Sequence, residues 1–377
     1  MKITLQILFL LLVIISCKSE KQKQFEKEII GEWNYVKEQA INKQKENEYE
    51  EPPSPFFANL GGFNFKNNGY VIDKIGFFNF DENKSREERR IRYIGDSTKY
   101  KINDDSLKIL DPITKSWNNY KIISINSDSL TLQKHKGYYI KYFKADYKLN
   151  PKETYDKIII SSSGCYGTCP IMDIEFNKNG EVYYLGEKYN LINGSYISKI
   201  SESEYNSIEK AFKKSNILKL NNHYSAPITD LNTVTVTFVK NNKIVKTISD
   251  YASQAPSEFI MAYRKAMYAY QKMKLEKLNP IVAFPNSTTF SIDKKNTHIF
   301  LSQSEKFLLL NEIRKGKIVS KEINPKYKLT FYNEDDFETG NIIYSDGRYF
   351  KSDKNTYDIG YNFIEENQIV NRTEPYF

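Results

Sequence analysis

Residues 99–110 read KYKINDDSLKIL, and this stretch decides the fold of the first third of the chain. Apolar and polar side chains alternate on both sides of the break Asn103-Asp104-Asp105. Alternation places successive side chains on opposite faces of a strand, and Asn and Asp favour turns. The stretch therefore predicts two short strands, 99–102 and 106–110, joined by a turn.

Segments of the same kind recur between residues 29 and 145. Polar or glycine-rich breaks such as Asn67-Asn68-Gly69 separate them. Many short, regularly spaced strands favour a closed all-β barrel or a sandwich. The expected strands are 32–36, 62–65, 70–75, 77–80, 91–94, 99–102, 106–110, 116–123, 129–133 and 138–143.

The start of this region contains a short motif. Gly31-Glu32-Trp33-Asn34-Tyr35 resembles the opening Gly-x-Trp of lipocalin-like domains, and the hairpins of residues 100–110 and 120–132 resemble the meander of that group. The resemblance implies a lipocalin-like β-barrel over residues 29–145. Trp33 would then either close the bottom of the barrel core or contact a ligand, and we expect the core position.

The composition excludes several classes of protein. The chain has 377 residues, 55 basic and 47 acidic side chains, and a net charge of +8, with 40% hydrophobic and 14% aromatic residues. One apolar run cannot make a polytopic membrane protein, and this aromatic content excludes wholesale disorder. Because basic and acidic residues interleave throughout, we expect no nucleic-acid partner.

The first residues resemble an export signal. Residues 1–16 place Lys2 before an apolar run and a small residue, as a secretory signal does. Residues 13–17 resemble the bacterial lipobox, which implies that Cys17 becomes the lipidated first residue. In such lipoproteins an Asp directly after the lipidated cysteine is the usual signal for retention in the inner membrane. No Asp follows Cys17, so we expect the protein in the outer membrane, in either leaflet. Residues 17–28 would then form a solvated tether between the lipid and the first folded unit. The alternative is an ordinary cleaved signal with an incidental cysteine.

Two further units follow the barrel, so the chain is predicted to be β-rich and α+β overall. Residues 152–278 mix strands with two helices, one begun by the capping box Ser201–Glu204 and one by Pro256. Residues 280–377 form a smaller α+β unit with a second capping box, Ser302–Glu305. This last unit either folds alone or packs onto the one before it.

The most distinctive segment is residues 163–170, which read SGCYGTCP. In an exported protein Cys165 and Cys169 should form a disulfide, which would fix the shape of one loop. A redox pair is the alternative, although the spacing is not Cys-x-x-Cys. Zinc is disfavoured because no second cysteine pair exists and the histidines are isolated, so we predict no metal. The three histidines are His135, His223 and His298.

The same segment resembles a known family. The cysteine motif 164–170, followed by Gly180-x-Val182-x-Tyr184, Gly194-x-Tyr196, Asp230, Asp250 and Pro256, resembles the domain of unknown function 6438 of bacterial exported and lipid-anchored proteins. The resemblance spans about residues 155–278 and implies no particular reaction. Asp230 and Asp250 match acidic positions of that family. They either cap turns beside strand ends or line a site, and we expect turn caps.

No catalytic motif is present in the sequence, and no cofactor is predicted. The leading hypothesis is a non-enzymatic, lipid-anchored envelope protein whose β-rich modules bind a ligand or another envelope protein. Its membrane partner would be reached through the lipid on Cys17. Two alternatives remain: a thiol–disulfide protein that uses Cys165 and Cys169, and a carrier of a small apolar ligand inside the barrel.

Overall fold

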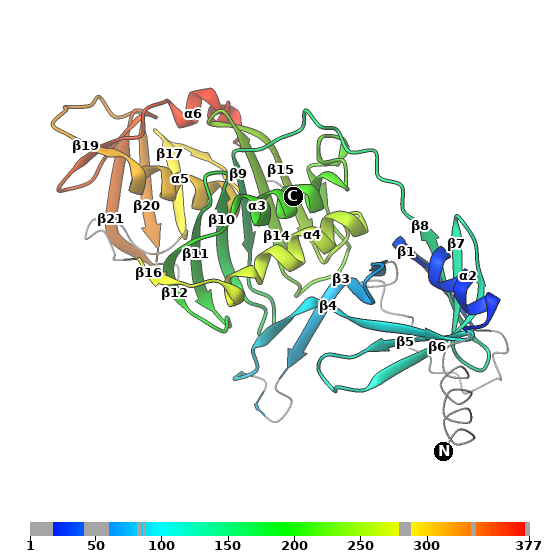
Figure 1. Ribbon diagram of the computed structural model, residues 1–377. Helices are drawn as coiled ribbons and strands as arrows, with labels where there is room; N and C mark the ends of the chain where they lie inside the picture. The colour runs from blue at the N-terminus through cyan, green and yellow to red at the C-terminus, as the bar shows by residue number, and fades with distance from the viewer. Residues whose placement is uncertain are drawn as a thin grey trace, which may run out of the picture. The chain divides into compact units, whose positions relative to one another are not determined.

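The computed structural model describes residues 18–40, 60–80, 84–85, 87–278, 288–332 and 337–373. Within these ranges the chain divides into two compact units (Figure 1). Unit 1 contains the residues up to 77 together with 94–147, and unit 2 contains residues 78–93 and those from 148 onward. No helix in the described part of the chain combines the length and the apolar character needed to cross a bilayer.

A closed antiparallel barrel of eight described strands lies mostly in unit 1, which confirms the predicted barrel; residues 78–80 of β3 and 91–93 of β4 are assigned to unit 2. The first and last strands close it, with Trp33 opposite Lys144. Two pairs of expected strands are single long strands, because Gly76 and Gly95 adopt positive φ angles of 88° and 131° and bend the chain without ending it. The strands are β1 Gly31–Ala40, β2 Gly62–Phe65, β3 Tyr70–Phe80, β4 Ile91–Asn103, β5 Ser106–Leu110, β6 Trp117–Ile125, β7 Ser129–His135 and β8 Tyr138–Lys144.

Side chains fill the described interior of the barrel. Trp33 has no exposed surface, and its Nε1 donates to the carbonyl of Ile29 at 2.7 Å. The Lys144 ammonium lies 5.0 Å from the centre of the same ring. The buried residues around Trp33 are Phe25, Ile29, Phe65, Val71, Ile102, Leu107, Ile109, Ile122, Leu130, Leu132, Ile140 and Tyr142. The structure thus places Trp33 in the core, as expected.

The predicted tether is wrong for most of its length, because Glu20–Glu28 form helix α2. The Ser19 side chain caps this helix by accepting from the amide of Gln22. Gln22 also donates to the carbonyl of Ile102 at 2.9 Å, and Phe25 is buried in the barrel core. Glu, Lys and Gln are strong helix formers, so one apolar anchor and one cap are sufficient to order the segment against the barrel.

Unit 2 is built on a sheet of eight described strands in the order β13-β15-β14-β9-β10-β11-β12-β16. Neighbouring strands are antiparallel except β13 and β15. The strands are β9 Lys157–Ser162, β10 Ile171–Asn177, β11 Glu181–Lys188, β12 Gly194–Lys199, β13 His223–Tyr224, β14 Thr233–Lys240, β15 Lys243–Tyr251 and β16 Glu276–Lys277.

Helices cover both faces of this sheet (Figure 1). The helices α3, Glu202–Lys213, and α4, Ser257–Met267, pack on one face, where Phe212 contacts Phe238 of β14. Helix α5, Gln303–Lys315, lies on the other face. Its Ser304 side chain bonds to Thr237, which precedes Phe238 in β14, and successive side chains of a strand point to opposite faces of the sheet. The capping boxes predicted at Ser201 and Ser302 are both formed.

A second sheet packs against the far side of α5. Its described strands lie in the order β18-β17-β20-β21-β22-β23-β19. The apolar residues of α5 share one buried core with both sheets, so residues from 288 onward belong to the same compact unit as the preceding domain. The strands are β17 Phe290–Lys294, β18 Thr297–Ile299, β19 Lys317–Val319, β20 Tyr327–Tyr332, β21 Glu338–Ser345, β22 Tyr349–Lys351 and β23 Thr356–Asp358. The short helices are η2 Ile217–Lys219, η3 Ala269–Lys272, α6 Phe363–Glu366 and η4 Ile369–Asn371.

Candidate functional site

A disulfide closes the loop between β9 and β10. Cys165 and Cys169 are joined, as predicted, with their Cα atoms 5.6 Å apart. Tyr166 lies between them and is 80% exposed, whereas Pro170 at the end of the loop is buried. A ring this small restricts the backbone of the loop, so the bridge holds an exposed aromatic side chain on a rigid support.

Asp230 stabilises this cysteine loop through its backbone. Its carbonyl accepts the amide of Tyr166 at 3.1 Å, and its own φ of 73° is left-handed, a conformation that Asp tolerates better than most residues. Its carboxylate accepts the Thr229 hydroxyl at 3.1 Å and is exposed to solvent. The residue therefore positions the loop that carries Tyr166.

Asp250 caps the turn that leads into α4. One carboxylate oxygen accepts the amides of Gln254 at 2.7 Å and Ala255 at 3.0 Å, and the other accepts the Tyr263 hydroxyl at 3.0 Å. The side chain is 1% exposed, and burial raises the pKa of Asp250 to about 6. These contacts fit the turn cap expected for this residue.

A pocket of about 230 Å³ opens beside the base of the cysteine loop. Strands β13, β14 and β15 form its floor, and the segment that leads into α5 forms its opposite wall. The residues that line it are Ser163, His223, Thr233, Thr235, Thr247, Ser249, Phe300, Leu301, Ser302 and Gln303. Ser163 belongs both to this pocket and to the start of the loop, where its hydroxyl accepts the amide of Thr233 at 2.9 Å.

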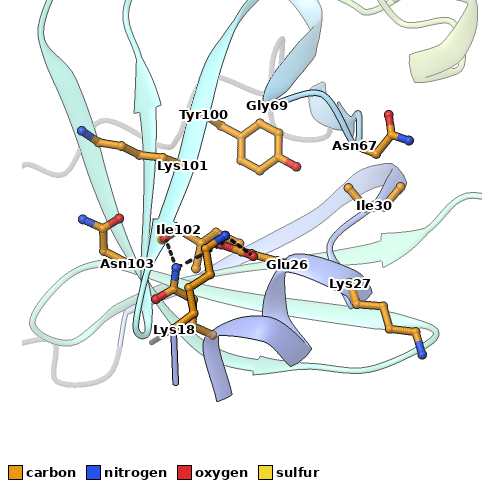
Figure 2. Close-up of a pocket in the computed structure, with 11 residues that line it drawn as sticks. Lys18, Glu26, Lys27, Ile30, Asn67, Gly69, Tyr100, Lys101, Ile102 and Asn103 are labelled. Atoms are coloured by element: carbon orange, nitrogen blue, oxygen red, sulfur yellow. Dashed lines mark hydrogen bonds and ion pairs between the residues drawn. The ribbon is translucent and has the colours of Figure 1, made fainter. Parts of the chain in front are cut away.

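Unit 1 has a larger groove of about 760 Å³, between α2 and the end of β4 (Figure 2). Two of its charged groups, Lys18 and Glu26, are paired with each other. Lys18 contacts both carboxylate oxygens of Glu26 at 2.8 Å, and Gln22 donates to the same carboxylate at 3.0 Å. The hydrogen bond from Lys18 lowers the pKa of Glu26 below its usual value. These contacts lie within α2 and the segment just before it, and Gln22 joins α2 to the barrel by donating to the carbonyl of Ile102 at 2.9 Å.

Buried charges lie between the first sheet of unit 2 and α5, and the sequence reasoning missed them. Glu175 of β10 has no exposed side-chain surface; it contacts Lys315 at 2.9 Å and Asn311 at 2.8 Å. Burial alone would raise the pKa of Glu175, but Lys315 and Lys157 hold it below its usual value. The sequence feature that could have revealed these buried charges is in residues 171–177, where two acidic residues, Asp173 and Glu175, occur two positions apart in a mainly apolar strand.

A second buried acid, Asp173, lies two positions earlier on the same face. Burial raises the pKa of Asp173 well above its usual range, and the neighbouring carboxylate of Glu187 adds to the rise. One of its oxygens accepts the Thr288 hydroxyl at 3.4 Å, while the other has no hydrogen-bond partner among the residues that the structure describes. Both acids are thus fully buried, and Glu175 bonds directly to α5 through Asn311 and Lys315.

The structure brings some of the predicted site residues together and separates others. Cys165, Cys169 and Asp230 form one loop cluster next to the pocket. Asp250 lies on the face of the sheet that points away from the pocket. It is the cross-strand partner of Val234, so the two share a face, whereas the next residue, Thr235, points to the other face and lines the pocket. Trp33 is in unit 1, and Cys17 lies outside the described residues.

Comparison with known families places part of the chain in a family of unknown role. A family described as a domain of unknown function (DUF6438) matches residues 156–270. The matched segment contains the cysteine loop and the floor of the pocket, whereas the wall at residues 300–303 lies outside it. Comparison with curated proteins gives no match.

Proposed function

We propose that this chain is a lipid-anchored protein of the bacterial outer membrane, and that it binds an envelope partner through unit 2 without catalysing a reaction. The observation that supports this most strongly is the cysteine loop. Its disulfide and the Asp230 carbonyl fix the backbone around Tyr166, which stays 80% exposed. A rigid, exposed tyrosine is typical of binding surfaces because it adds contact area at low cost in conformational entropy.

The anchor has a structural consequence if Cys17 is lipidated. Only Lys18 and Ser19 separate that cysteine from α2, which is docked on the barrel through Gln22 and Phe25. The chain thus has almost no slack between the lipid and the folded barrel, and unit 1 would stay close to the membrane surface. A flexible tether of the same length would let unit 1 move away from the membrane, whereas a helix docked on the barrel does not.

The anchor is tested by replacing Cys17 with Ala in cells that express the full chain. We expect wild-type protein to incorporate labelled fatty acid and to fractionate with the outer membrane, and the C17A variant to lose both properties. Ser19→Ala is the matched control, because it removes a helix cap close to the cysteine and leaves the lipidation residue intact. Membrane attachment of C17A equal to wild type would refute the anchor.

The binding role is tested by photo-crosslinking in living cells from position 166. A photoreactive amino acid replaces Tyr166 in one strain and Ile318, which is 65% exposed on the second sheet of unit 2, in the control strain. We expect a discrete crosslinked species from position 166 and none from position 318. An absence of crosslinks from position 166, or identical products from both positions, would refute a binding role for the loop.

A further inference from the structure

The pocket beside the cysteine loop has a neutral lining. None of its ten lining residues is Asp, Glu, Lys or Arg. His223 is the one titratable group among these lining residues, and burial lowers the pKa of its imidazole below the usual value, which favours the uncharged ring. Without a charge in its wall the pocket offers no ion pair to a charged ligand.

Hydroxyl groups dominate this lining. Six of the residues are Ser or Thr: Ser163, Thr233, Thr235, Thr247, Ser249 and Ser302. The hydroxyls of Thr233 and Ser249 make no hydrogen bond to any described residue. A hydroxyl can both donate and accept, so these two groups can bond to a ligand that does the same.

The start of α5 does not make the pocket an anion site. The amide of Ser304 already donates to Thr235 at 3.1 Å, and the amide of Glu305 donates to Ser302 at 3.3 Å. The Glu305 carboxylate adds a negative charge to this first turn, where Arg372 contacts it at 2.7 Å. The positive end of the helix is thus neutralised by the protein itself.

Phe300 and Leu301 add apolar side chains to the lining, from the segment that leads into α5. A sugar ring has the matching chemistry, with C–H groups on its faces and hydroxyls at its edge. The volume of about 230 Å³ is below the usual range for drug-sized ligands, so one ring fits better than a chain of rings. We infer that this pocket binds a single ring of a neutral saccharide, through the hydroxyls of Thr233 and Ser249 and the Phe300 side chain.

This inference rests on the proposed function, because it names a ligand class for the same face of unit 2. Its test uses the mature chain with C17A, titrated by calorimetry and saturation-transfer NMR with glucose and N-acetylglucosamine. Glucuronate and inorganic phosphate serve as charged probes. We expect binding of a neutral sugar and weaker or undetectable binding of both anions.

Variants locate the binding site. Thr233→Val and Ser249→Ala each remove one open hydroxyl with little change of shape, and each should weaken sugar binding about threefold to tenfold. Ser195→Ala is the control, because Ser195 on β12 carries a hydroxyl of the same sheet that also has no partner in the described chain, and it does not line the pocket. An unchanged thermal unfolding temperature shows that each variant is folded.

The outcomes separate the inference from the proposed function. Equal sugar affinity in T233V, S249A and wild type would overturn the inference, as would tighter binding of glucuronate or phosphate than of the neutral sugars. If no sugar binds while position 166 still crosslinks a partner in cells, the inference fails and the proposed function stands. If position 166 captures nothing while sugar binding depends on Thr233 and Ser249, the pocket assignment stands and the partner surface is wrong.

Discussion

The stability of unit 2 should depend on pH through Asp250. The carboxylate is 1% exposed and accepts three hydrogen bonds, yet burial raises its pKa from 3.8 to about 6. The folded state therefore holds a proton more tightly than the unfolded chain does. Between these two pKa values stability rises as the pH falls, and above pH 6 the folded state bears the full cost of the buried charge.

The size of this effect follows from the two pKa values. A rise from 3.8 to about 6 corresponds to about 3 kcal/mol, of which about 2 kcal/mol falls between about pH 4.5 and about pH 7.5. Asp250→Asn keeps an oxygen for the amides of Gln254 and Ala255 and has no charge. The stability of D250N relative to wild type should thus increase by about 2 kcal/mol from the lower to the higher pH.

The assay is urea unfolding at the two pH values, followed by circular dichroism. Trp33 and Trp117, the two tryptophans of the chain, are both in unit 1, so their fluorescence reports the unfolding of that unit separately. The unfolding curve measured by fluorescence should be the same for D250N and wild type. Asp353→Asn is the control, an exposed aspartate of unit 2. A stability difference between D250N and wild type that stays constant across the pH range would refute the reasoning.

Three other changes probe the core, the loop and the buried charges. Phe25→Ala should destabilise unit 1 by about 3 kcal/mol, measured by tryptophan fluorescence in urea, because it empties the site where α2 docks; no change would mean that α2 is not anchored there. Replacing Cys165 and Cys169 by Ser should cost about 2 kcal/mol in unit 2, and the bridge in the wild-type protein should survive mild reductant in a thiol-labelling assay, whereas rapid reduction would favour the redox alternative. Lys315→Met should destabilise unit 2 by about 3 kcal/mol at neutral pH because it leaves the Glu175 carboxylate buried without that cation, and a variant as stable as wild type would refute the role of this pair.

Features that depend on a few neighbouring residues were predicted from the sequence. The capping boxes at Ser201 and Ser302 satisfy helix amides only three residues away, so they form wherever the chain folds. Strict alternation of apolar and polar residues likewise predicted the barrel strands. The bends at Gly76 and Gly95 broke that alternation without ending the strands.

Features that depend on distant residues could not be predicted. Helix α2 has one large apolar side chain, Phe25, and its order depends on the barrel surface that receives it. The pocket combines Ser163, His223, β14, β15 and the segment 300–303, and no local pattern links these positions. The partners of the buried Glu175 could not be predicted for the same reason, since Asn311 and Lys315 lie on α5.

The central claim is that the cysteine loop of unit 2 is a binding surface held in shape by its disulfide. The most direct test compares crosslinking in cells from position 166 with and without the bridge, using Cys165→Ser and Cys169→Ser together. We predict that the crosslinked fraction of the protein, measured relative to its total amount in the cell, falls several-fold in the bridge-free variant, while the membrane attachment of the protein stays unchanged. An undiminished crosslink without the bridge would contradict the claim.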